Sequence, residues 1–388
     1  LIQWIHRSTR GWSYGASVVD PRTGEIIKGH VSLGSLRIRQ DFLIALGLTE
    51  DPYAYNQDKD QEILDLALNR IKQLSAHEIG HTLGFAHNFA ASAKNRTSVM
   101  DYPHPKLKLI DGKINYKDAY KDGIGDWDKI SVAYSYSDFP ESIEEDKALQ
   151  SILKKSIKEG HKFISDYDAR PIGGAHPSAH LWDNGDNAVN ELRNILKIRK
   201  IALDNFYINH IKENETVSLL EDRLVPIYLL HRYQVEAVSK IIAGQEYSYA
   251  VKTDGNVPKT TIVNKSFQKE ALDLILLTLK PINLSLPNRL LDLFPARSYG
   301  FSRNRESFDS QTGPTFDYLG ISNVLTDKIL QLLFHPNRAS RLVQQKALDE
   351  SHFSLFEMID EIFESTIKNI PSDSYNRELQ NIVNFNVL

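Results

Sequence analysis

The sequence predicts an α+β protein, with strands near the N-terminus and helices over most of the remaining length. Three observations lead to this fold class. Two β-type runs flank a turn at residues 20–24, a helical apolar pattern covers residues 63–76, and helical patterns dominate after residue 140. We therefore expect a first domain over residues 1–140 and a helical second domain over residues 141–388.

The composition is that of an ordinary soluble globular protein, since 41% of the 388 residues are hydrophobic and 25% are charged. This length is sufficient for two domains with separate cores. The net charge of −4 gives no reason to expect nucleic acid or an anionic membrane surface as a partner. No apolar run reaches transmembrane length. Because the chain has no cysteine, it forms neither disulfides nor a cysteine-ligated metal site.

The first residues, LIQWI, resemble a strand that is already under way, and no signal-like segment precedes them. We expect the sequence to be part of a longer precursor, with the N-terminal part of the first domain missing. Next, β-type runs at residues 13–20 and 25–33 flank the turn sequence DPRTG. They predict a hairpin.

A helix is predicted in front of a histidine-rich motif. Apolar residues recur at three- and four-residue spacing from residue 63 onward: Ile63, Leu64, Ala67, Ile71 and Leu74. This pattern leads directly into residues 77–87, which read HEIGHTLGFAH. They fit H-E-x-x-H-x-x-G-x-x-H, a pattern that needs such a helix.

The spacing of this motif predicts a zinc site with three histidine ligands. His77 and His81 lie one turn apart on the same face of a helix, so both imidazoles can reach one ion. Gly84 can end the helix and turn the chain because glycine tolerates positive φ, and that turn brings in His87 as third ligand. Glu78 is the candidate general base. The fourth position of the ion stays open for water, as in catalytic zinc sites.

A second segment, residues 98–103, reads SVMDYP, and its Met100 is one of only two methionines in the chain. Together with the motif, this segment resembles the metzincin clan of zinc endopeptidases, in which a methionine-containing turn lies beneath the zinc. The resemblance implies that Met100 forms this turn. It also implies that Tyr102 is a movable zinc ligand or a hydrogen-bond donor in the transition state. By residue type alone, Met100 can equally fill the core and Tyr102 can be a packing tyrosine.

The same resemblance implies a fold and a reaction for the first domain. Metzincin catalytic domains place a small twisted sheet before the active-site helix, and an edge strand of that sheet binds the substrate in extended form. We expect this edge strand within residues 25–36, and a capped helix at residues 125–134 near the end of the domain. The implied reaction is peptide-bond hydrolysis by a zinc-activated water, with Glu78 as general base and Tyr102 beside the oxyanion.

Beyond residue 140 we expect helices at residues 142–166, 186–212, 217–243, 266–279, 322–346 and 352–368. Residues 176–185 and 225–234, together with residues 20–24, resemble a group of bacterial zinc-dependent metalloproteases that join a metzincin-like catalytic domain to a long helical region. This resemblance implies an extracytoplasmic location, in the periplasm, at the cell surface or secreted. We interpret the histidines of these segments, His176, His180 and His231, as structural residues.

Two other functions remain compatible with the sequence. The protein can be a zinc hydrolase that acts on a non-peptide amide, or a non-catalytic binding protein whose fold zinc stabilises. Glu78 argues against the binding protein, because a scaffold needs no general base. Cleavage of casein or peptides that a chelator blocks would separate these alternatives.

Overall fold

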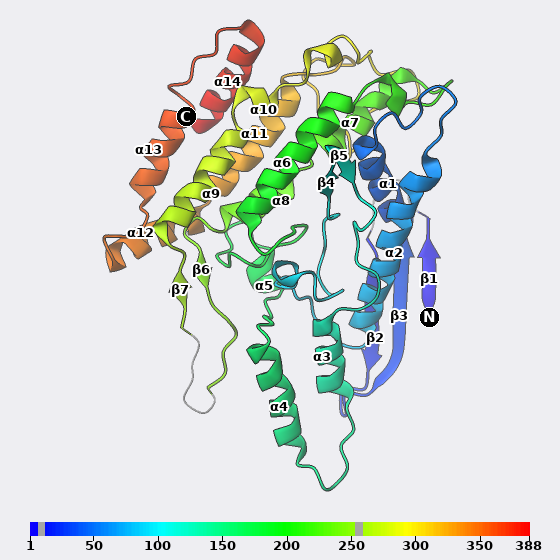
Figure 1. Ribbon diagram of the computed structural model, residues 1–388, viewed down its shortest axis with the longest axis vertical. Coiled ribbons are helices and arrows are strands. Elements are labelled where there is room, and N and C mark those ends of the chain that lie inside the picture. The colour runs from blue at the N-terminus through cyan, green and yellow to red at the C-terminus, as the bar shows by residue number, and fades with distance from the viewer. Residues whose placement is uncertain (7–11, 253–258) are drawn as a thin grey trace.

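The computed structural model describes residues 1–6, 12–252 and 259–388. Its fold class is α+β, with a small sheet at one side and a large group of helices at the other (Figure 1). The strands are β1 (Ile2–Ile5), β2 (Tyr14–Val19), β3 (Ile26–Gly34), β4 (Lys108–Ile110), β5 (Lys113–Asn115), β6 (Gln245–Glu246) and β7 (Thr261–Ile262). The α-helices are α1 (Leu36–Leu48), α2 (Asp60–Thr82), α3 (Asp126–Tyr136), α4 (Glu145–Lys158), α5 (Asp166–Ala169), α6 (Ala188–Asn205), α7 (Leu220–Tyr228), α8 (Arg232–Ser239), α9 (Lys265–Thr278), α10 (Pro281–Leu284), α11 (Gly320–Leu333), α12 (Pro336–Leu348), α13 (Leu355–Ser365) and α14 (Ser374–Val387).

The N-terminal sheet has the strand order β1-β3-β2, with β1 parallel and β2 antiparallel to β3. The predicted hairpin is confirmed, and the amide of Gly24 closes its turn by donating to the carbonyl oxygen of Asp20 at 2.8 Å. The expectation of an edge strand within residues 25–36 is wrong. β3 lies between the other two strands, so β1 and β2 form the edges. The alternation of residues along a strand indicates its faces but not its neighbours.

Helix α2 carries the histidine motif and packs against both the sheet and α1 (Figure 1). Leu74 of α2 packs with Val31 and Leu33 of β3 in a small buried cluster. α1 was not expected from the sequence. Its C-terminal half is apolar on more than one face because it packs against α2 and also against α7. That double burial hides the one-sided pattern by which surface helices are identified.

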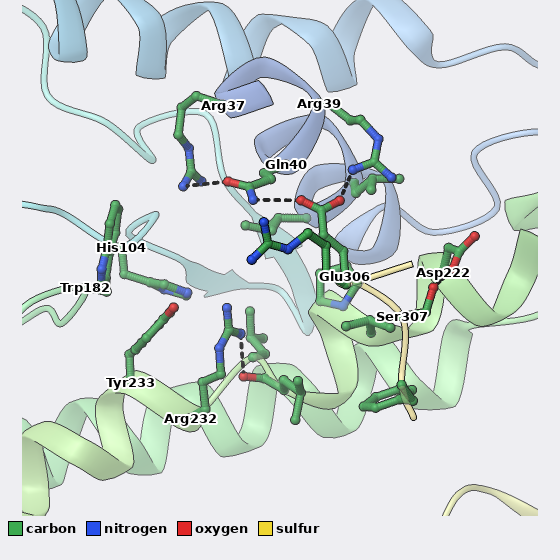
Figure 2. A pocket seen from close by; sticks show the side chains of 18 of the residues that line it. Arg37, Arg39, Gln40, His104, Trp182, Asp222, Arg232, Tyr233, Glu306 and Ser307 are labelled. Atoms are coloured by element: carbon green, nitrogen blue, oxygen red, sulfur yellow. Dashed lines mark hydrogen bonds and ion pairs between the residues drawn. The ribbon is translucent and has the colours of Figure 1, made fainter. Parts of the chain in front are cut away.

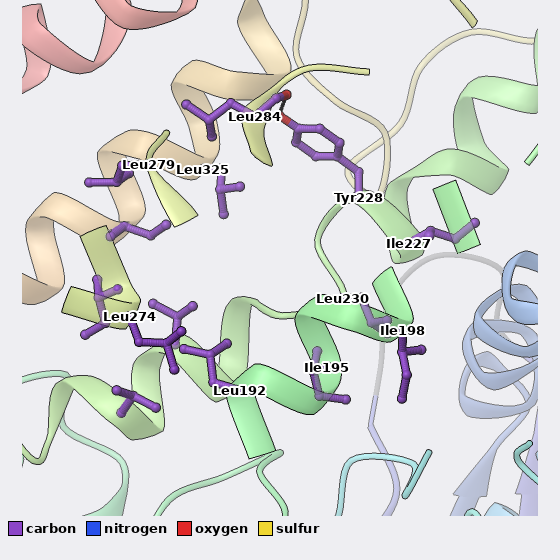
Figure 3. Close-up of a cluster of buried hydrophobic side chains, with 14 of the residues drawn as sticks. Leu192, Ile195, Ile198, Ile227, Tyr228, Leu230, Leu274, Leu279, Leu284 and Leu325 are labelled. Atoms are coloured by element: carbon purple, nitrogen blue, oxygen red, sulfur yellow. Dashed lines mark hydrogen bonds between the residues drawn. The ribbon is translucent and has the colours of Figure 1, made fainter. Parts of the chain in front are cut away.

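The largest hydrophobic cluster is built mainly from the helical region (Figure 3). Its labelled members come from α6 to α11 and their connections: Leu192, Ile195, Ile198, Ile227, Tyr228, Leu230, Leu274, Leu279, Leu284 and Leu325. Leu46 of α1 and Ile63 of α2 belong to the same cluster. The apolar core therefore continues across residue 140, and the division at that residue stays a prediction.

Two of the long helices expected in this region are each divided into two. Residues 217–243 form α7 and α8, which are separated by a turn at residues 229–231. Residues 322–346 are divided at Pro336, which is the first residue of α12. Proline has no amide hydrogen and favours the first helical position, so it begins a new helix here. Within the described ranges, no helix has both the length and the apolar character that a membrane crossing needs.

Candidate metal centre

The imidazole rings of His77, His81 and His87 converge on one point. The Nε2 atom of His81 lies 3.1 Å from Nε2 of His77 and 3.1 Å from Nε2 of His87. His77 is buried, whereas the other two rings are partly exposed. Three rings from one helix and the turn after it therefore present one nitrogen each to a common space.

The opposite nitrogen of each ring is held by a fixed acceptor. Nδ1 of His77 lies 2.6 Å from the carbonyl oxygen of Val99, and Nδ1 of His81 lies 2.8 Å from that of Phe85. Nδ1 of His87 lies 2.8 Å from Oδ2 of Asp166 in α5. Because carbonyl oxygens only accept hydrogen bonds, the Nδ1 atoms facing them carry the proton. The Nε2 atoms are then free to bind a metal, and such outer partners fix both tautomer and ring orientation.

This donor set fits a zinc ion. Zn–N bonds of 2.0–2.1 Å in tetrahedral geometry imply neighbouring nitrogens about 3.3 Å apart, close to the separations above. Burial, and then the neighbouring ring of His81, lower the pKa of His77 well below its usual value. Burial also lowers the pKa of His87, although Asp166 opposes this. Histidine ligates metals as neutral imidazole, so the site favours the ligating form.

The turn that returns His87 to the site is a glycine-dependent helix end. α2 ends at Thr82, and Gly84 has a φ of +88°. The amide of Phe85 donates to the carbonyl of Gly80 at 3.1 Å, and that of Gly84 donates to the carbonyl of His81 at 3.0 Å. These two bonds form a Schellman motif, whose left-handed position favours glycine. The turn also presents the Phe85 carbonyl to His81, so it orients one ligand while bringing in another.

A family model described as Met-zincin matches residues 59–373, which include this whole site. The chain belongs to the Met-zincin family. The match confirms the resemblance to metzincin-type metalloproteases. Searches of curated proteins and of solved structures found no match to the chain.

In this Met-zincin, Met100 lies against the helix that carries the ligands. A Cβ added at Gly80 would lie 2.3 Å from Sδ of Met100, so the thioether occupies the space that a side chain would take. Met100 is buried, and its carbonyl oxygen accepts a hydrogen bond from the amide of Asn88 at 3.0 Å. The segment around Met100 therefore contacts both α2 and the chain directly after His87.

Asp128 of α3 holds this segment of the Met-zincin in place. One carboxylate oxygen accepts from Oγ of Ser98 at 2.6 Å. The other accepts from the amides of Val99 at 2.9 Å and Gly125 at 2.6 Å. Asp128 is buried, so the three bonds are shielded from water. Since Val99 provides the acceptor for His77, α3 positions a candidate metal ligand in two steps, through Asp128 and Val99.

Glu78 is buried next to His77 and accepts a hydrogen bond from the backbone amide of Gly15 in β2. Burial raises the pKa of Glu78 to about 7, although this hydrogen bond and the charge of Arg70 oppose the rise. The close approach requires glycine, because a Cβ at Gly15 would lie 1.9 Å from the carbonyl oxygen of Glu78. The strand therefore lies directly against the helix at the candidate base.

The ring of Tyr102 lies beside the ligands, with its centroid 5.3 Å from that of His77 and 4.7 Å from that of His87. Nη2 of Arg170 donates to the Tyr102 hydroxyl at 3.2 Å, and Arg170 is also ion-paired with Asp166. Burial raises the pKa of Tyr102, whereas Arg170 lowers it. The hydroxyl oxygen thus accepts a bond from arginine while its own hydrogen stays available for donation.

The structure brings together all the residues that the motifs indicated, and it adds others. Asp166 and Arg170 lie outside any motif, and the sequence predicts only the end of a helix at residue 166, whereas Asp166 begins the short helix α5. Asp128 had a usable signal, because an acidic residue three positions after Gly125 is typical of a helix N-terminus. Nothing in the sequence shows that its carboxylate also binds the methionine segment.

Proposed function

We propose that this Met-zincin is a zinc-dependent endopeptidase that hydrolyses peptide bonds. The observation that carries the proposal is the convergence of three Nε2 atoms whose Nδ1 atoms are all held by acceptors. Family membership supports the same reaction class. Bound by His77, His81 and His87, zinc supplies Lewis acidity, which polarises a carbonyl group and makes water a nucleophile at neutral pH.

The surrounding side chains take the proton-transfer and orienting roles. The carboxylate of Glu78 accepts the proton of the attacking water and passes it to the nitrogen of the leaving amine. The hydroxyl of Tyr102 donates a hydrogen bond to the oxygen of the scissile carbonyl. Support for the Tyr102 role comes from its place beside the ligand rings and from Arg170, which leaves its hydrogen free.

The substrate is proposed to lie along β2 rather than β3. β2 is an edge strand that packs on α2, where Oγ of Ser17 donates to the carbonyl oxygen of Thr82 at 2.6 Å. Gly15 of the same strand contacts Glu78. An extended peptide can add to such an edge through main-chain hydrogen bonds. Binding along a strand leaves both peptide ends free, which favours cleavage of internal bonds.

The test measures zinc content and peptide cleavage together. The zinc-loaded protein should cleave casein and end-blocked, internally quenched peptides, lose this activity to a chelator, and regain it with zinc. Glu78→Gln should keep zinc and reduce the cleavage rate by roughly 10²- to 10⁴-fold, because it removes the general base. Glu62→Gln is the matched control, since Glu62 is exposed on the same helix.

Two results would contradict the proposal. Cleavage by Glu78→Gln at the wild-type rate would remove the assigned base. A protein with stoichiometric zinc that cleaves no peptide would instead favour a non-peptide amide or a binding function.

A further inference from the structure

A cavity of about 440 Å³ lies apart from the metal centre, between α1, α7, α8 and residues 304–309 (Figure 2). None of the three histidine ligands lines it, nor does Glu78. Trp182 separates the two sites. Its ring packs on Tyr102 with centroids 5.1 Å apart, and it also lines the cavity. A cavity of this size is in the range of small-molecule sites.

The cavity is amphipathic. Apolar side chains from α1, α7, the turn after α7, α11 and the 304–309 segment form much of its wall, namely Leu43, Ile44, Val225, Leu229, Phe308 and Val324. Arginines gather at the polar part, where Figure 2 shows Arg37 and Arg232 on opposite walls with the cavity between them. A ligand that fits both parts has an apolar body and a negatively charged group.

Most charges at the cavity are neutralised within the protein. Arg37 is ion-paired with Asp41, Nη2 donating to Oδ1 at 2.6 Å. Arg39 is ion-paired with Glu306, whose other oxygen accepts from Gln40 at 3.0 Å. These ion pairs fix the positions of the wall side chains, but they leave little net charge to attract a ligand.

Arg232 differs from the other half-buried arginines of the wall. Its Nη1 donates to the carbonyl oxygen of Leu229 at 2.9 Å, and its guanidinium lies 4.2 Å from the ring centroid of Tyr233. Among the residues that the structure describes, no carboxylate forms an ion pair with it. A guanidinium presents five N–H donors, so Arg232 keeps most of its hydrogen-bonding capacity for a ligand.

The pKa of His104 indicates the sign of the charge around this part of the cavity. Its ring is buried at the cavity wall. Burial, and then the positive charges of Arg232 and Arg37, lower its pKa to about 3. The ring therefore stays neutral. A positive region lined by a neutral imidazole and a tyrosine can hold an anion by hydrogen bonds as well as by charge.

We propose that this cavity binds an organic monocarboxylate with an apolar tail. The carboxylate lies at Arg232, opposite Arg37, and the tail covers the apolar wall. Two arginines of the lining, the half-buried Arg232 and the exposed Arg305, have no carboxylate partner among the described residues, and one carboxylate gives the half-buried guanidinium the partner it lacks. Both the C-terminal residue of a peptide and a free fatty acid have this chemistry. The site goes beyond the proposed peptidase function and does not depend on it.

Calorimetric titration of the zinc-loaded protein tests the site with N-acetyl-leucine and with octanoate. The neutral probes N-acetyl-leucinamide and octanamide have the same tails without the charge. We expect at least one acid to bind and both amides to bind at least roughly 10-fold more weakly. Binding of N-acetyl-leucine alone indicates a peptide C-terminus as the source, and binding of octanoate alone indicates a fatty acid.

Two variants locate the binding. Arg232→Gln should weaken the acid roughly 10- to 100-fold, because it removes a charge-assisted bond. Val324→Trp should obstruct the apolar part from α11, where Val324 is partly exposed. Arg193→Gln, on the surface of α6 and outside the cavity, is the control. Thermal unfolding checks that all three variants fold.

The proposal is overturned by any of three results. Neither acid binds at millimolar concentration, the amides bind as tightly as the acids, or folded Arg232→Gln and Val324→Trp bind the acid like the wild type.

Discussion

Nδ1 of His87 lies 2.8 Å from Oδ2 of Asp166, although 79 residues separate the two in the chain. Asp166 belongs to α5, beyond the expected end of the catalytic domain. The contact therefore makes the helical region part of the candidate metal centre. It also links the ligand to Tyr102 through Arg170, which contacts both Asp166 and the Tyr102 hydroxyl.

Asp166→Ala should weaken zinc binding by roughly 10- to 100-fold, because His87 loses the partner that fixes its tautomer and orientation. Competition with a chelator of known affinity measures this directly, without any activity assay. Tyr167→Ala is the control on the same short helix, since Tyr167 is 90% exposed. Unchanged zinc affinity in Asp166→Ala would show that Asp166 does not orient His87 for zinc binding.

Asp128→Ala should destabilise the protein by about 3 kcal/mol or more, since it leaves three buried donors without an acceptor at about 1–3 kcal/mol each. Zinc affinity should fall as well, because Val99 orients His77. Urea unfolding measures the loss. Asp126→Ala is the control on the same helix, where the carboxylate is 66% exposed, and equal losses in both variants would refute the role.

Gly80→Ala should destabilise the protein by roughly 1–3 kcal/mol, because the new Cβ would overlap Sδ of Met100. The direction is diagnostic, since glycine to alanine within a helix normally stabilises by about 0.5–1 kcal/mol. A double-mutant cycle with Met100→Ala isolates the clash. Thermal unfolding should show Gly80→Ala to be less harmful when Met100 is already shortened. Additive effects would mean that the two residues do not interfere.

Gly15→Ala should move β2 away from α2, because the Cβ would meet the backbone oxygen of Glu78, which cannot rotate away. We expect a loss of roughly 1–3 kcal/mol. Gly34→Ala is the matched control at the end of β3, where a Cβ meets nothing within 4 Å. If both variants unfold at the wild-type temperature, β2 does not pack on the helix as described.

The convergence of the three histidines could be predicted because it is local. His77 and His81 are one helical turn apart, and a single glycine turn returns His87, so spacing alone constrains the geometry. Their outer partners could not be predicted in the same way. Val99 contributes a backbone carbonyl, which has no residue signature, and Asp166 comes from a distant segment.

The same distinction between local and distant contacts explains where the fold expected from the sequence differs from the observed one. β3 was expected at an edge because its sequence shows a strand but not which strands pair with it. α1 was missed because it is buried against two neighbours. A single long helix was expected over residues 322–346, although Pro336 is the strongest local signal there for the start of a new helix.

The separation of His87 from Asp166 also orders events during synthesis on the ribosome. At about 5–20 residues per second, about 4–16 s pass between the incorporation of His87 and that of Asp166. A nascent chain therefore holds a complete ligand set long before the third imidazole has its acceptor. We expect the three imidazoles to reach their final arrangement only after translation has passed α5, so the candidate metal centre is completed late in the synthesis of the chain.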